Sequence, residues 1–174
     1  MRRLHIYDFD ETLVKTMATV RVMGGESVKK LTPAQFAAYQ PSPGDAFDFA
    51  EFDAIIHDAH PIEVNLQLLR DSLSNPSIKT TILTARGLAF PVRQYLRERF
   101  GIEAYVVALA DGNPNKKAEY VESELKKGYS EVLFVDDSIH NVKAVRRLQK
   151  HYPAATIKVI HTLESSKLDP KHIL

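Results

Sequence analysis

The sequence predicts an α/β fold, because short apolar runs alternate along the chain with segments of helical periodicity. The apolar runs of strand length lie at residues 4–7, 79–83 and 132–135, with weaker runs at 104–108 and 155–160. The helical patterns lie between them, at residues 66–73, 92–100, 116–127 and 142–149. Strands that alternate with helices form a parallel sheet covered on both faces. We therefore expect a three-layer, doubly wound (Rossmann-like) parallel sheet.

The stretch from residue 15 to residue 60 interrupts this alternation and carries several glycines and prolines typical of turns. We interpret it as a small cap or lid insertion after the first strand, within a single domain of residues 1–174. A short helix is expected inside it after Thr32. Thr32 and Gln35 have the spacing of a capping box, and Pro33 suits the first helical position.

Three phenylalanines in the acidic segment 45–53 of this insertion allow two interpretations. The rings of Phe47, Phe49 and Phe52 pack the insertion onto the rest of the domain, or the segment forms a lid that shields the site and selects the substrate. We favour the packing interpretation and keep the lid as the alternative.

Composition excludes several classes of protein. The chain has 174 residues, a net charge of +1 and no cysteine, so disulfides, thiolate metal sites and a cysteine nucleophile are all excluded. No apolar run approaches the length that spans a membrane, and no apolar signal core follows the basic Met1-Arg2-Arg3. We expect a cytoplasmic protein without an obligate protein partner.

Acidic and hydroxyl side chains follow three of the predicted strands. Asp8 and Asp10 come after the first, Thr84 after the second and Asp136-Asp137 after the fourth. In an extended chain, residues two apart face the same side, so Asp8 and Asp10 are expected together, with Phe9 turned to the core. Because ligands bind beyond the carboxyl ends of parallel strands, the site is expected there. Paired carboxylates suit Mg²⁺.

The segment Asp8-Phe9-Asp10-Glu11-Thr12 resembles the first motif of the haloacid dehalogenase superfamily, Asp-x-Asp-x-Thr after the first strand. The resemblance implies that Asp8 is the nucleophile that attacks phosphorus. It implies that Asp10 protonates the leaving oxygen and then activates water. Thr12 is expected near the substrate, and both aspartates are expected at the metal.

The second and third motifs of the same superfamily have counterparts. Thr84, at the end of the next core strand, is expected to donate to a phosphoryl oxygen. Arg86 is either a bidentate phosphate contact or a surface arginine at the start of the next helix. The third motif is a lysine near a helix start, for which both Lys116 and Lys117 are candidates. We favour Lys117, because its spacing to Tyr120 resembles that in relatives. Its charge would balance Asp8 and the phosphoryl group.

The fourth motif is an acidic pair after an apolar strand, here Asp136-Asp137. Asp137 corresponds best to the superfamily's metal ligand, and Asp136 is either a further ligand or a residue that supports one. Asn141 stands where many members have another acid. His57 and His60 have a metal-ligand spacing but no evident third ligand, so we do not assign them, and we expect His140 at the surface.

Together these features predict a Mg²⁺-dependent phosphomonoester hydrolase that forms an aspartyl-phosphate. The substrate is expected to be a phosphorylated small molecule, a nucleotide or a polynucleotide end. Three alternatives stay open: a binding or regulatory module without activity, a phosphotransferase of the same fold, and a dehalogenase. Retention of both Asp8 and Asp10 argues against the first, and dependence on Mg²⁺ would separate a phosphatase from a dehalogenase.

Overall fold

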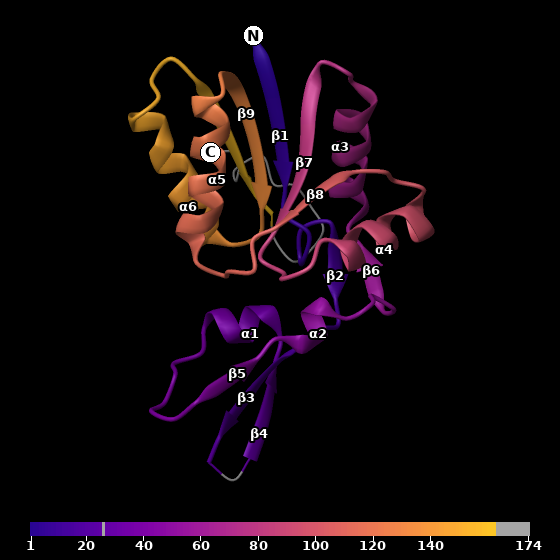
Figure 1. Ribbon diagram of the computed structural model, residues 1–174, viewed down its shortest axis with the longest axis vertical. Helices are drawn as coiled ribbons and strands as arrows, with labels where there is room; N and C mark the ends of the chain where they lie inside the picture. Colours follow the sequence, from indigo (N-terminus) through magenta and orange to yellow (C-terminus); the bar gives the residue numbers. More distant parts are fainter. Residues whose placement is uncertain (26, 163–174) are drawn as a thin grey trace.

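The computed structural model describes residues 1–25 and 27–162 and has at its centre a parallel sheet of five strands (Figure 1). The spatial order is β10-β9-β1-β7-β8, and all four neighbouring pairs are parallel. The bounds are β1 Arg2–Tyr7, β7 Ile78–Thr84, β8 Tyr105–Ala108, β9 Tyr129–Asp136 and β10 Thr156–His161. The five predicted apolar runs match these strands to within two residues at both ends, except that β9 begins three residues earlier than predicted.

Four helices flank this sheet, and each overlaps one of the predicted helical segments. They are α3 Glu63–Ser74, α4 Phe90–Phe100, α5 Pro114–Lys126 and α6 Ile139–Arg147, the last continued by a 3-10 turn, η1 Leu148–Lys150. The prediction of an α/β protein with a parallel sheet flanked by helices is therefore confirmed, and the architecture is compatible with a Rossmann-like fold.

The apolar side chains form two clusters, and the central strand β1 contributes to both by alternation. Leu4 and Ile6 belong to a cluster that contains the buried faces of α5 and α6. Tyr7 and Phe9 belong to the cluster formed with α3 and α4. Figure 1 shows α5 and α6 on one side of β1 and α3 and α4 on the other. The central strand is thus buried from both directions, which fixes the position of its carboxyl end.

The order of the strands places the carboxyl ends of β1 and β9 at a switch point. The chain proceeds from β1 outward through β7 to β8, and then returns to the opposite side of β1 as β9 and β10. In such sheets the helices leave in opposite directions at this point and open a crevice beyond the strands. Tyr7 pairs with Val135, so the following residues, Asp8 and Asp136, come next to each other at this crevice.

The stretch between the first strand and α3 forms a separate antiparallel arrangement. Its strands are β2 Val14–Thr16, β3 Val20–Gly24, β4 Ser27–Leu31, β5 Ala46–Asp48 and β6 Ala59–Pro61, and its helices are α1 Pro33–Ala37 and α2 Ala50–Asp53. β2 pairs with β6, while β4, β3 and β5 form a sheet of three strands. Figure 1 shows this sheet beyond the carboxyl ends of the parallel strands.

The expected helix after Thr32 is present, with both hydrogen bonds of the capping box to Gln35. Phe36 packs edge-to-face against Phe47 and Phe49, so these rings hold the antiparallel sheet to α1. Phe52 does not join them and lies against Arg86 instead. Of the three phenylalanines in the acidic segment, two therefore stabilise the insertion internally and one contacts the rest of the domain.

Within the described ranges, no helix combines the length and the apolarity needed to cross a membrane.

Candidate active site

A tight turn follows β1 and separates the two aspartates of the first motif. The carbonyl oxygen of Phe9 accepts hydrogen bonds from the backbone N–H groups of Thr12, Leu13 and Val14. Glu11 has φ of +58°, in the left-handed region that residues other than glycine rarely occupy. The chain therefore turns here instead of continuing as an extended strand. Phe9 is fully buried, as expected, but the carboxylates of Asp8 and Asp10 bind different partners.

Lys117 lies between Asp8 and Asp136. Its Nζ donates to Asp8 Oδ1 and to Asp136 Oδ2, both at 2.7 Å, and all three side chains are buried. Lys117 is in the first turn of α5, on the same buried face as Ala118 and Val121. Of the two candidate lysines, the fold thus brings Lys117 into the crevice.

Lys116 lies on the exposed side of the same helix, where it pairs with Glu119 at 2.9 Å. This contrast gives a matched test. We expect Lys117→Met to lower the free energy of unfolding by about 3–5 kcal/mol in metal-free buffer, because two buried carboxylates lose their counter-ion. We expect Lys116→Met to change it by less than about 0.5 kcal/mol. Urea denaturation of both variants measures the difference, and equal effects would contradict the assignment.

The oxygens of Asp136 are already occupied by donors from the protein. Besides Lys117, the backbone N–H of Ser138 donates to Oδ1 at 2.8 Å, and the side-chain amide of Asn141 contacts both oxygens at 3.0 and 3.1 Å. Ser138 in turn caps the start of α6 by accepting from the N–H of Asn141. Asp136 therefore fixes Lys117 and the loop before α6, and few of its lone pairs stay free for another ligand.

Thr12 joins the first motif to the fourth. Its Oγ1 accepts the backbone N–H of Asp137 at 3.1 Å and lies 3.2 Å from Asp8 Oδ2 and 3.4 Å from Asp137 Oδ1. Thr12 is fully buried, and its carbonyl oxygen accepts from the buried side-chain amide of Asn65 at 2.8 Å. Thr12 thus ties the two acidic loops together. Neither Asn65 nor this linking contact was predicted, although Asn65 shares the buried face of its helix with Leu66 and Leu69, which marks it as an unusual polar position.

The charges in the crevice are unbalanced. Oxygen atoms of Asp8, Asp136 and Asp137 lie within 4.8 Å of one another, against the one ammonium of Lys117. Burial raises the pKa of Asp8 to about 6, although Lys117 opposes the rise. Burial and the charges of Asp8 and Asp136 raise the pKa of Asp137 to about 9. Burial alone would lower the pKa of Lys117, but the charges of Asp136 and Asp8 raise it above the ordinary value. Oxygen donors in this arrangement fit a hard divalent cation such as Mg²⁺.

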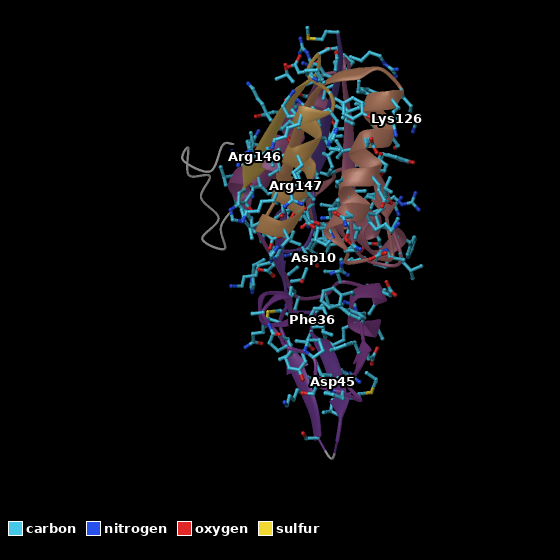
Figure 2. All side chains as sticks on the ribbon, turned by 90° about the vertical axis from the view of Figure 1, so that its left-hand side faces the viewer. Asp10, Phe36, Asp45, Lys126, Arg146 and Arg147 are labelled. Carbon is cyan, nitrogen blue, oxygen red and sulfur yellow. The ribbon has the colours of Figure 1, made fainter. Side chains whose placement is uncertain are left out.

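Asp10 lies on the other side of the turn and is held by Arg86. The guanidinium donates through Nε to Asp10 Oδ2 at 2.9 Å and through Nη2 to Oδ1 at 2.7 Å, a bidentate pair. The hydroxyl of Thr16 also donates to Oδ1, at 3.1 Å. The acidic group formed by Asp8, Asp136 and Asp137 does not include Asp10. Figure 2 shows Asp10 at the lower end of the main body, above the insertion in which Phe36 and Asp45 are labelled.

The environment of Arg86 differs from the predicted phosphate contact. Its Nη1 donates to the carbonyl oxygen of Phe52, and the guanidinium lies 5.4 Å from the ring centroid of Phe9 and 5.3 Å from that of Phe52. The next residue, Gly87, donates its N–H to Asp53 at 3.0 Å. All three donor nitrogens of Arg86 are thus directed at Asp10 and α2, and Arg86 connects the insertion to the first motif.

Thr84 ends β7, next to β1, and is fully buried. Its Oγ1 accepts the backbone N–H of Arg86 at 3.2 Å, which leaves the hydroxyl hydrogen available to another acceptor. His140 is exposed on α6, as expected. His57, before β6, and His60, on β6, are also exposed, and neither belongs to a metal-ligand group found in residues 1–25 and 27–162. Comparison of the chain with protein-family models, curated proteins and solved structures found no match in any of the three.

Proposed function

We propose that this chain is a phosphomonoester hydrolase of the haloacid dehalogenase type, with Asp8 as nucleophile. The observation that carries the proposal is the buried Asp8 carboxylate, which lies at the switch point of a parallel sheet and is held by Lys117 beside two further carboxylates. A carboxylate that is fixed and charge-balanced at such a crevice is placed to attack an electrophile that carries negative charge. A binding module without activity would not require the second aspartate, Asp10, to be fixed so closely.

The proposed reaction has two steps. In the first, an oxygen of Asp8 bonds to phosphorus, the bond from phosphorus to the leaving oxygen breaks, and Asp10 gives that oxygen its proton. In the second, Asp10 takes a proton from water, and the water oxygen attacks phosphorus. The bond from phosphorus to Asp8 then breaks, which releases phosphate and restores both carboxyl groups. Lys117 stays beside Asp8 through both steps, and the Thr84 hydroxyl is available to a phosphoryl oxygen.

The residues that would hold Mg²⁺ are Asp8 and Asp137. The side chain of Asp137 contacts Thr12 Oγ1 and Asp8, whereas Asp136 is filled by Lys117, Ser138 and Asn141. Asp136 therefore supports the site, and the side chain of Asp10 is engaged by Arg86. When bound, the cation would neutralise charge on the carboxylates and on the phosphoryl oxygens. The proposal makes Asp137, of the fourth-motif pair, the direct ligand.

The finer architecture belongs to the same proposal. We infer a three-layer, doubly wound domain over residues 1–174, in which the insertion at 15–60 acts as a small cap. Residue 26 and residues 163–174 of that range lie outside the described residues. The position of the antiparallel sheet beyond the carboxyl ends of the parallel strands supports a cap. So does the contact of Phe52 with Arg86, since it joins the insertion to the residue that holds Asp10.

The test of the proposal is hydrolysis of a generic aryl phosphate by the purified protein, with Mg²⁺ and with EDTA. We expect phosphate release that requires Mg²⁺, is abolished by EDTA and returns when Mg²⁺ is restored in excess. Release that is unaffected by EDTA would contradict the metal assignment. Release of halide from a haloacid without Mg²⁺ would favour the dehalogenase alternative instead.

The acidic crevice also predicts how stability depends on pH. Asp8 and Asp137 have pKa values of about 6 and about 9 in the folded protein, against an ordinary 3.8. Between about pH 4 and about pH 9, the folded state therefore binds more protons than the unfolded state. The stability of the metal-free protein then falls as the pH rises through this range. Because Mg²⁺ binds the ionised carboxylates, the increase in melting temperature that it causes should grow with pH.

Thermal melts with and without Mg²⁺ across this pH range measure the effect, with Asp137→Asn as the comparison. The variant should lose most of the pH dependence above pH 6 and most of the stabilisation by Mg²⁺. Stabilisation by Mg²⁺ that is the same at pH 5 and pH 8 would contradict this account of the crevice.

A further inference from the structure

A polar groove of about 200 Å³ lies beside the candidate active site, between the start of α5 and one face of α6. The proposed two-step reaction uses none of its residues. The side chains that line it are Asn113, Pro114, Asn115, His140, Lys143 and Arg147, above the buried Ala144. Of these six residues, Pro114 is partly buried and the other five are exposed.

The face of α6 that forms one wall carries two basic side chains and a histidine, and none of the three pairs with an acid in the described residues. His140, Lys143 and Arg147 are spaced by three and four residues, so they follow one another along the helix. No ion pair or hydrogen bond joins any of these three side chains to another residue in the described part of the chain. Before the start of α5, the side chain of Asp111 accepts the backbone N–H of Asn113 at 2.8 Å.

The stability of the helix does not account for this row of cations. Like charges four residues apart, as in Lys143 and Arg147, destabilise a helix slightly. Basic residues in the last turn interact favourably with the helix dipole, which explains Arg146 and Arg147 at the end of α6. The helix dipole gives no such gain to Lys143, which lies in the middle of the helix.

Both walls of the groove begin close in sequence to residues of the candidate active site. Asn115 is two residues before Lys117, which binds Asp8 and Asp136, and His140 is the neighbour of Asn141, which binds Asp136. A substrate with its reacting phosphate against Asp8 would therefore extend past the groove if it left the crevice on this side. Figure 2 shows Arg146 and Arg147 on the same helix, above the level of Asp10.

We propose that this groove binds a second phosphate group of the substrate, one that is not cleaved. The inference rests on the proposed phosphatase function. Lysine and arginine donate charge-assisted hydrogen bonds to phosphate oxygens, arginine in bidentate fashion, and the amides of Asn113 and Asn115 add neutral donors. The second phosphate would be that of a small bisphosphate or the first backbone diester of a polynucleotide end. Its recognition would explain a preference for such substrates over a plain monoester.

The test compares kcat/KM for three substrates: an aryl phosphate with one phosphate, a nucleoside bisphosphate, and a short oligonucleotide with a terminal phosphate. The variants are Lys143→Ala and Arg147→Ala, with Arg146→Ala as the matched control, because Arg146 is adjacent and exposed but does not line the groove. We expect the ratio of kcat/KM for the two larger substrates to that for the aryl phosphate to fall about tenfold in Lys143→Ala and Arg147→Ala. In Arg146→Ala the ratio should stay within about twofold of wild type.

A fall for both larger substrates supports recognition of any second phosphate. A fall for the oligonucleotide alone supports the backbone diester as the phosphate that the groove binds. The slope of log affinity against log salt concentration for the oligonucleotide should then become shallower by about one for each cation removed. An unchanged ratio in both groove variants, or an equal fall in Arg146→Ala, would overturn the proposal. Melting temperatures should fall only slightly in any variant, because none of these side chains has a hydrogen-bond or ion-pair partner in the described residues and the helix dipole contributes little.

Binding of the bisphosphate by calorimetry and of a fluorescein-labelled oligonucleotide by anisotropy separates this inference from the proposed function. If the wild-type protein hydrolyses no phosphate ester, weaker binding in Lys143→Ala and Arg147→Ala than in Arg146→Ala still supports the groove. Equal binding by all the variants and the wild type overturns it, whatever the outcome for hydrolysis.

Discussion

Replacing Asp8 by Asn is expected to abolish hydrolysis of an aryl phosphate, with a loss in kcat on the order of 10⁴ or more, since an amide cannot serve as the nucleophile. The fold should be retained. Asn has nearly the same shape, Lys117 keeps its contact with Asp136, and the buried carboxyl with a raised pKa is removed. We therefore expect a melting temperature equal to or above that of wild type in metal-free buffer.

The matched control for this variant is Asp58→Asn, because Asp58 is an exposed aspartate outside the crevice. It should have wild-type kcat and KM. Wild-type activity in Asp8→Asn would remove Asp8 from the reaction, and loss of activity in both variants would indicate an effect on the preparation instead of the mechanism. Circular dichroism and thermal melts of the two variants distinguish these outcomes.

Arg86→Ala is expected to lower kcat by about 10²–10³, with little change in KM, because general acid–base catalysis contributes on this scale and Arg86 fixes the group that performs it. Arg86 is a positioning residue in this account: its donors are directed at Asp10 and Phe52. Arg86→Lys should restore little, since an ammonium cannot form the bidentate pair. Steady-state kinetics of both variants measure the separate effects on kcat and KM.

The double variant Arg86→Ala/Asp10→Asn separates positioning from substrate binding. If Arg86 acts through Asp10, adding Arg86→Ala to Asp10→Asn should cost little further activity, because the two residues then act as one unit. A rise in KM in Arg86→Ala with kcat unchanged would favour the phosphate contact predicted from the sequence. Melting temperatures show how much of the effect is loss of stability, since Arg86 is buried.

The sequence predicted the parallel sheet and its helices because their patterns are local. Strands β7 and β9 are apolar runs that end at polar residues, and α5 buries Lys117, Ala118 and Val121 at helical spacing. The sequence favoured Lys117 over Lys116 through the resemblance to relatives, and in the structure the helical spacing puts Lys117 on the buried face and leaves Lys116 exposed. The antiparallel sheet of the insertion was not predicted, because β4 is exposed along its length and has no alternation of apolar and polar residues to mark it.

The pairing within the site depends on tertiary structure, which explains what the sequence did not predict. Asp10 and Arg86 are 76 residues apart, and their contact requires both the left-handed turn at Glu11 and the placement of α2 against the end of β7. A positive φ at a glutamate has no signature in the sequence. The chain does not stay extended through Asp8 and Asp10 as the sequence pattern predicts, because the turn directs their carboxylates to different partners.

The measurement that tests the central claim most directly is mass spectrometry of the protein after acid quenching during turnover of an aryl phosphate. Asp10→Asn is the best form to use, because slower attack by water should allow the covalent intermediate to accumulate. The account predicts an added phosphoryl group on the peptide that contains Asp8, removable by hydroxylamine and absent from Asp8→Asn. Steady turnover by the wild-type protein with no such adduct in Asp10→Asn, or an adduct on another residue, would contradict it.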